Sequence, residues 1–192
     1  MRYPPEYKAK ARQKVVETAG ALAKKQGFGT TGVDALMSAA GFTTGAFYSH
    51  FGSREALLKA IVDNELGKTV ALFAGQDRAA LERGIQRYLH LQHVDHPEAG
   101  CLLPSLTAEV ARANDETRQS FEQQLTELVA SVQDGLGDHV NAWAILTQMV
   151  GAVMLARALH SDEARKVVLS AAKESILSQL HSQDEPATNQ GD

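Results

Sequence analysis

The chain has 192 residues, of which 44% are hydrophobic and 22% are charged. These proportions are ordinary for a globular protein and allow one large domain or two small ones. The single cysteine excludes an intrachain disulfide framework and favours a reducing, cytoplasmic location. No run of about 18 apolar residues occurs, and the first residues are polar and basic, so the sequence predicts neither a membrane span nor a secretory leader.

The net charge of −4 is unevenly distributed along the chain. Residues 1–60 carry nine Lys and Arg against four Asp and Glu, whereas residues 61–192 carry ten against nineteen. A basic first third followed by an acidic remainder predicts a polyanionic partner for the first third alone. A chance fluctuation among solvated faces is the alternative.

Nearly every segment has the apolar spacing of a helix, and no alternating β-branched run indicates a strand. The sequence therefore predicts an all-α fold of about nine helices, over about residues 5–26, 33–41, 44–50, 53 to the 70s, 77–93, 101–113, 115–133, 139–160 and 162–180. The expected domains are a three-helix DNA-binding domain (1–52), an effector-binding and dimerisation domain (53–182), and a disordered tail (183–192). The long fourth helix joins the two domains without a Gly/Ser linker.

Residues 29–59 have the spacing of two short helices joined by a glycine turn, which is typical of a helix-turn-helix. Gly41 supplies the residue tolerant of positive φ, and Thr43 is placed to cap the following helix. The residues expected to bury one face are Ala39, Ala40, Phe42, Phe47 and Phe51. The opposite face carries small and polar side chains, which let a helix backbone approach base edges in a major groove.

The predicted DNA-contacting residues are Thr43, Thr44, Gly45, Ala46, Tyr48, Ser49, His50 and Arg54. Thr and Ala can touch a thymine methyl group, whereas Tyr, His and Arg side chains suit phosphates. The cations Lys8, Lys10 and Arg12 add long-range attraction. The alternative is a helical hairpin with an unusually aromatic, uncharged loop.

The string AAGFTTGAFYSHFGSREALL, residues 39–58, resembles the hallmark of the TetR family of bacterial transcriptional regulators, AAG(V/L)(S/T)xGxxYxHFxSKExLL. The resemblance covers about a quarter of the chain directly. It implies that Thr44, Gly45, Ala46 and Ser49 face the bases. It also implies that Tyr48, His50 and Arg54 hold the DNA backbone. Two positions depart from the family: Thr44 stands where Arg or Lys is common, and Asp34 where relatives present a basic or neutral residue. The operator sequence therefore does not carry over.

The signal that controls DNA binding is predicted from the remaining residues. Cys101 lies at the start of a helix, where N–H groups favour a thiolate, and GCLL…L.AEVA resembles a family branch that senses electrophiles or oxidants. A small buried hydrophobe is the other interpretation of Cys101. A second candidate is an apolar effector pocket, whose predicted lining residues are Tyr88, Leu102, Leu106, Phe121, Trp143 and Gln148. Ordinary core packing is the alternative for each of them.

Metal binding by His90, His93 and His96 is considered because of their i, i+3 spacing, but Pro97 follows at once and the prediction is no metal. No nucleophile–base motif, phosphate loop or paired-carboxylate signature appears, so the sequence predicts neither an enzyme nor a cofactor.

The two C-terminal helices are apolar on more than one face and are predicted to pair with those of a second copy, whereas an intrachain hairpin is the alternative. A two-fold dimer suits a near-palindromic operator. The leading hypothesis is a homodimeric repressor released from operator DNA by an unknown small molecule. The alternatives are the same regulator switched by oxidation or alkylation of Cys101, and a helical interaction protein that does not bind DNA.

Overall fold

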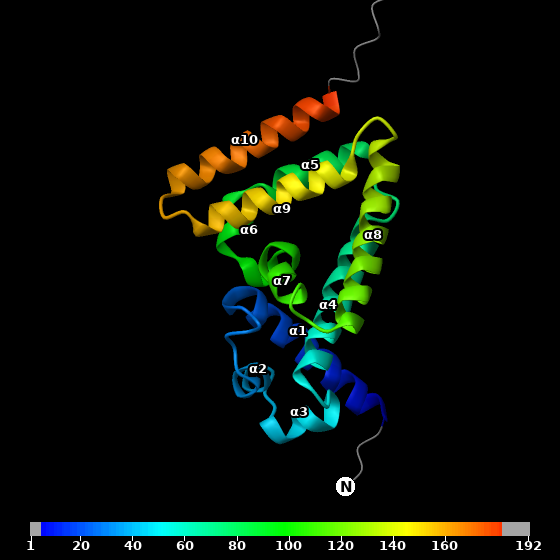
Figure 1. Cartoon of the computed structure of the whole chain (residues 1–192), viewed down its shortest axis with the longest axis vertical. Helices are drawn as coiled ribbons and strands as arrows, with labels where there is room; N and C mark the ends of the chain where they lie inside the picture. The colour runs from blue at the N-terminus through cyan, green and yellow to red at the C-terminus, as the bar shows by residue number, and fades with distance from the viewer. Residues whose placement is uncertain (1–4, 182–192) are drawn as a thin grey trace, which may run out of the picture. The chain divides into compact units, whose positions relative to one another are not determined.

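The computed structural model describes residues 5–181, and every regular element in that range is helical (Figure 1). The prediction of an all-α fold is confirmed. The elements are α1 (Pro5–Gln26), α2 (Val33–Ala39), α3 (Thr44–His50), α4 (Arg54–Phe73), α5 (Arg78–Tyr88), α6 (Leu91–Asp95), the 3-10 helix η1 (Pro97–Ala99), α7 (Leu103–Val110), α8 (Asp115–Leu136), α9 (Ala142–Ala158) and α10 (Asp162–His181).

The described residues form ten α-helices, one more than expected, because the helix expected over residues 77–93 is divided. Leu89 follows α5 with ψ near 52°, outside the helical range, and α6 begins two residues later. Leu89 is only 1% exposed, so its side chain is packed in the core at the position where the helix is interrupted.

The described chain separates into two compact units. The first contains the residues up to Leu72 together with 96–126, and the second contains 73–95 and 127–181. Helix α8 passes from the first unit to the second. These two units are defined by which residues pack together. The boundary expected after residue 52 separates a DNA-binding part from an effector-binding part, and it stays a prediction. The tail expected over 183–192 lies outside the described residues.

The core of the first unit forms around α1, whose apolar stripe is buried as its helical spacing predicts. Val15 and Ala19 are fully buried, and Phe28, just beyond the helix, is 4% exposed. Gly20 allows α4 to approach closely, since a Cβ there would lie 3.3 Å from Cγ2 of Ile61. Gly27 ends α1 with a φ of +85°, a conformation that glycine adopts without steric cost.

The core of the second unit is centred on α9 and α10, which lie side by side (Figure 1). Val153 and Ile176 from these helices are fully buried. Other apolar residues of the same pair stay on the surface of the chain, among them Leu155 at 62% and Val167 at 63% exposure. Across the described residues, no helix is both long enough and apolar enough to cross a membrane.

Candidate nucleic-acid interface

The turn between α2 and α3 has the geometry of a helix-turn-helix. Gly41 has a φ of +79°, as predicted for the turn residue. Thr43 occupies the N-cap position of α3, but its side chain makes no capping hydrogen bond, contrary to expectation. Its carbonyl oxygen instead accepts a hydrogen bond of 3.0 Å from the backbone N–H of Ala46. The backbone turn therefore starts α3 without help from the Thr43 hydroxyl.

The buried face of α3 is anchored by Phe47, which is 2% exposed and stacks on Phe51 at 6.0 Å between ring centroids. Leu36 and Met37 of α2 are fully buried in the same unit. Ala39, expected on the buried face, is exposed. Its place in the last turn of α2, two residues after Met37, turns it toward solvent.

The opposite face of α3 is open to solvent. The exposed residues are Thr44, Gly45, Tyr48 and Ser49, while Ala46 and His50 are half-buried. Tyr48 is the most prominent of them, with 67% of its surface exposed. Among the described residues, and apart from its chain neighbours and its own helix backbone, the nearest atom to a Cβ on Gly45 would be Oγ1 of Thr43 at 3.9 Å, so this position is open to substitution. The surface therefore combines small side chains with one projecting phenol.

Two hydroxyl groups on this face donate hydrogen bonds within the protein. The Thr44 hydroxyl donates to Oδ1 of Asp34 in α2, and the Ser49 hydroxyl donates to the carbonyl oxygen of Ala46 at 2.8 Å. The sequence pattern did not indicate the bond to Asp34, because it joins residues of two different helices.

Cations from α1 lie close to the aromatic residues of the helix-turn-helix. The Arg12 guanidinium lies 5.0 Å from the ring centroid of Phe51, and Nζ of Lys14 lies 5.9 Å from that of Phe42. Lys14 was not among the predicted cations. Its position four residues after Lys10, on the exposed face of the same helix, was the signal that could have found it.

His50 lies at the C-terminal end of α3. Its Nδ1 is buried, and no residue in the described range 5–181 forms a hydrogen bond with it. Burial, followed by the nearby charges of Lys8 and Arg12, lowers the pKa of His50 below its ordinary value of 6.5. The imidazole is therefore neutral at neutral pH in the free protein.

Arg54, expected to contact a phosphate, is engaged within the protein. Its guanidinium donates to the carbonyl oxygens of Phe28 and, at 2.8 Å, of Thr31, and it stacks over the Phe28 ring at 4.7 Å. These contacts close the loop between α1 and α2 against the start of α4. The phosphate contact of Arg54 stays a prediction.

A buried lysine ties α1 to α4 and to the loop before Cys101. Nζ of Lys24 forms an ion pair of 2.6 Å with Glu65 and donates a hydrogen bond of 2.9 Å to the carbonyl oxygen of Gly100. The next residue, Cys101, is half-buried, and its Sγ accepts a hydrogen bond of 3.4 Å from the N–H of Leu103. Lys24 was not predicted, since a charged side chain on an apolar stripe usually reaches solvent.

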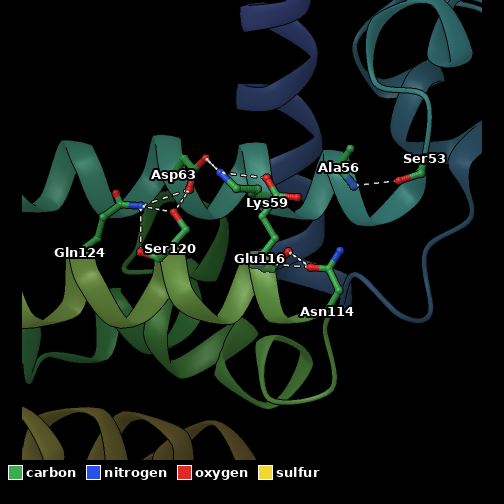
Figure 2. A network of polar contacts seen from close by, with 9 residues as sticks. Ser53, Ala56, Lys59, Asp63, Asn114, Glu116, Ser120 and Gln124 are labelled. Atoms are coloured by element: carbon green, nitrogen blue, oxygen red, sulfur yellow. Dashed lines mark hydrogen bonds and ion pairs between the residues drawn. The ribbon is translucent and has the colours of Figure 1, made fainter.

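A second polar contact region joins α4 to α8 inside the first unit, as Figure 2 shows. The carboxylate of Asp63 accepts hydrogen bonds from Ser120 at 2.5 Å and Gln124 at 3.2 Å through Oδ1, and pairs with Lys59 at 2.8 Å through Oδ2. Lys59 also lies 4.0 Å from Glu116. Helix α4, the next helix after α3, is thus held to α8 by a charged network.

The residues predicted to line an effector pocket fall in both units. Leu102 and Leu106 are buried in the first unit at 1% and 0% exposure, where Phe121 is half-buried. The other three belong to the second unit, namely Tyr88, Trp143 and Gln148. Their role in effector binding stays a prediction.

Each of these three residues of the second unit has a distinct environment. Tyr88 packs on the ring of His93 at 4.3 Å between centroids, and Gln148 donates to the Ser175 hydroxyl at 3.0 Å. Trp143, expected in a pocket wall, is 46% exposed on α9. Among the described residues, no three His, Cys, Asp or Glu side chains gather in a way that could hold a metal ion.

Residues 15–61 match the family described as bacterial regulatory proteins, tetR family. No curated protein matches the sequence. The structure is similar to that of Escherichia coli NemR in its reduced form, with a TM-score of 0.71 and 19% identity over 87% of this chain and 95% of that chain.

Two further solved structures have the same fold. A putative transcriptional regulator of the TetR/AcrR family has a TM-score of 0.70 at 20% identity, covering 90% of this chain and 99% of that chain. A TetR transcriptional regulator from Chloroflexus aurantiacus also has a TM-score of 0.70 at 20% identity, covering 93% of this chain and 97% of that chain. These likenesses show the fold, and the match of residues 15–61 adds the helix-turn-helix sequence. Residues 15–61 therefore have the helix-turn-helix sequence of the tetR family of bacterial regulatory proteins, and the chain has the fold of these solved regulators.

Proposed function

We propose that the protein is a homodimeric, sequence-specific DNA-binding transcriptional regulator that acts as a repressor. The observation that carries the proposal is the solvent-exposed face of α3, with its small residues and Tyr48, on a helix-turn-helix whose first helix brings Arg12 and Lys14 nearby. A recognition helix enters a major groove by such a face, and cations beside it bind phosphates.

Phosphate contacts supply most of the affinity in this proposal. The exposed Tyr48 hydroxyl donates a hydrogen bond to a phosphate of the DNA backbone, and the cations of α1 attract the phosphates by their charge. Gly45 and Ala46 let the α3 backbone come near the base edges, where the Thr44 methyl group can contact a thymine methyl. Sequence-dependent DNA shape contributes the remaining selectivity.

The dimer forms through α9 and α10. Trp143, Leu155 and Val167 are 46%, 62% and 63% exposed, and a monomer would leave these apolar side chains in water. A two-fold pairing of the two helices covers them and presents two recognition helices to a near-palindromic operator.

Release from DNA is proposed to act through α4. This helix begins right after α3 and is held at Lys24–Glu65 on one side and at Asp63–Ser120 on the other. A small molecule that moves α8 or the loop before Cys101 would change these contacts and so the placement of α3. The effector is expected to contact predicted residues within one unit, either Leu102, Leu106 and Phe121 of the first or Tyr88, Trp143 and Gln148 of the second.

A second candidate for the signal is modification of Cys101. The N–H of Leu103 points at its sulfur at 3.4 Å, and a hydrogen bond of this kind stabilises a thiolate. Oxidation or alkylation would remove that acceptor beside the carbonyl bound by Lys24. In this case Cys101→Ser keeps DNA binding and loses release by electrophiles, whereas normal release of the serine variant contradicts the thiol switch.

A mobility-shift assay with the DNA that flanks the gene tests the proposal. The protein is expected to shift an upstream fragment at modest salt and to prefer it over an equal mass of unrelated duplex. An intact dimer that binds no fragment would instead favour a helical interaction protein that does not bind DNA. Addition of candidate effectors or of a thiol-reactive electrophile then separates the two modes of release.

A further inference from the structure

Asp34 places a carboxylate beside the first residue of the recognition helix. It is exposed in the first turn of α2, and its Oδ1 accepts the hydrogen bond from the Thr44 hydroxyl. It is one of only four acidic residues among residues 1–60, which carry nine Lys and Arg. A carboxylate in this place weakens the attraction between the protein and DNA phosphates. We therefore look for a different contact that Asp34 makes to DNA.

The hydrogen bonds on this face determine what it can offer to DNA. The Thr44 hydroxyl donates a hydrogen bond to Asp34, and the Ser49 hydroxyl donates one to the Ala46 carbonyl oxygen. Both hydroxyl protons are thus used inside the protein, and the bond to a carboxylate is of the stronger, charge-assisted kind. Apart from the exposed Tyr48 hydroxyl, which is assigned to the DNA backbone, what remains outward is acceptor lone pairs and methyl groups, because Gly45 has no side chain and Ala46 only a methyl.

We propose that Asp34, held in place by Thr44, is a specificity-determining residue that selects a base with an exocyclic amino group in the major groove, cytosine above all. The inference rests on the proposed DNA-binding function and deepens it. Thr44 acts as the positioning residue, since its hydroxyl fixes one carboxylate oxygen and leaves Oδ2 to accept from the base.

The donor and acceptor pattern of the major groove explains the choice of base. An ionised carboxylate accepts hydrogen bonds and donates none. Cytosine presents a donor at N4, guanine presents the two acceptors N7 and O6, and adenine presents a donor at N6 beside the acceptor N7. The carboxylate is therefore attracted by cytosine and repelled by guanine, with adenine between them. The favourable contact offsets the repulsion between the carboxylate and the phosphates.

A purely structural role makes a different prediction. An acidic residue in the first turn of a helix stabilises it through the helix dipole, and Asp34 holds α2 to α3 through Thr44. If that were its whole role, Asp34→Asn would alter the unfolding temperature and leave the base preference unchanged. Base preference is thus the readout that separates the two roles.

The experiment selects binding sites from a pool of random duplexes with the full-length protein, and repeats the selection with Asp34→Asn. Asp134→Asn is the matched control, since it removes the same charge from an exposed site on α8 in the other unit. We expect the native protein and the control to enrich cytosine at one position of each half-site. The Asp34→Asn variant should prefer adenine there, because an amide matches N6 and N7 of adenine.

Binding to single duplexes then gives the size of the effect. Exchanging that cytosine for guanine should weaken binding of the native protein about tenfold or more, and the Asp34→Asn variant should lose most of this discrimination. Thr44→Val should keep the cytosine preference with reduced discrimination. An unchanged preference in a tightly binding Asp34→Asn variant overturns the inference alone. Failure of the native protein to enrich any sequence overturns the proposed function and, with it, this inference.

Discussion

One face of α3 and the outer face of the α9–α10 pair are both exposed, yet the first is small and polar and the second is apolar. Around α3 the apolar side chains are turned inward, with Phe47 2% exposed, and what remains outside is small or polar apart from Tyr48. On α9 and α10 large apolar side chains stay outside, with Leu155 at 62% and Val167 at 63% exposure. The first surface suits a hydrated polyanion, and the second suits another apolar surface.

Because of this difference, DNA binding and dimerisation should be removable by separate substitutions. The helix-turn-helix depends on one small aromatic cluster, whereas the exposed apolar residues of α9 and α10 contribute little to the folding of the isolated chain. A substitution in the core around α3 should therefore leave dimerisation intact, and a substitution on the outer face of α9 and α10 should leave the subunit folded.

Phe47→Ala should have the largest effect. Removing a fully packed aromatic ring from the small core around α3 should cost about 3–5 kcal/mol of folding free energy and abolish DNA binding. Urea unfolding measures the loss of stability, and a mobility shift measures the loss of DNA binding. In sedimentation the variant should still associate as the native protein does. Native DNA affinity in this variant would contradict the account of the α3 core.

Lys24→Met should destabilise the first unit by about 3 kcal/mol, because it leaves Glu65 and the Gly100 carbonyl without their buried cation. The matched control is Lys25→Met, an exposed neighbour that should change the stability by no more than about 0.5 kcal/mol. Chemical unfolding of both variants checks the difference. Equal stability of the two variants would show that the buried pair contributes nothing.

Leu155→Glu should break the proposed dimer, at a cost of about 2 kcal/mol or more in association, because a charge would be buried in the apolar interface. The subunit should stay folded, and DNA affinity should fall because each monomer holds one half-site. Leu72→Glu, at 66% exposure on α4, is the control and should remain dimeric. Sedimentation equilibrium distinguishes them, and a dimeric Leu155→Glu variant would place the interface elsewhere.

His50→Gln should have the smallest effect on folding, seen in the pH dependence of stability. Burial and the nearby Lys8 and Arg12 lower the pKa of His50 below 6.5, so just below that pH the unfolded chain binds a proton that the folded one does not. Stability contributed by neutral His50 is complete above pH 6.5 and decreases as the pH falls toward the lowered pKa. The glutamine variant should lose this part of the slope, and an unchanged slope would contradict the assignment to His50.

Sequence reasoning succeeded where local patterns determine structure. The glycine turn at Gly41 was predicted in this way. The end of α1 at Gly27 and the Ser53 cap of α4, whose hydroxyl accepts from the N–H of Ala56 at 3.1 Å, depend on the same short-range chemistry. Helical spacing likewise located the buried residues Val15 and Ala19.

Contacts between distant residues could not be predicted in the same way. The pairing of Lys24 with Glu65 spans 41 positions, and Arg54 donates to carbonyl groups 23 or more residues earlier. No periodicity within one helix specifies such partners. The divided helix near Leu89 was missed for a related reason, because neither a proline nor a glycine marks the break.

The central claim is that the exposed face of α3 binds DNA, and Gly45→Glu tests it most directly. The position is open, since a Cβ there would lie 3.9 Å from Oγ1 of Thr43, so the fold should tolerate a glutamate that would collide with and repel DNA. Fluorescence anisotropy with an operator duplex, together with the unfolding temperature, measures both properties. We expect tight binding by the native protein and none by Gly45→Glu at an unchanged unfolding temperature. Equal binding by the two proteins would contradict the account.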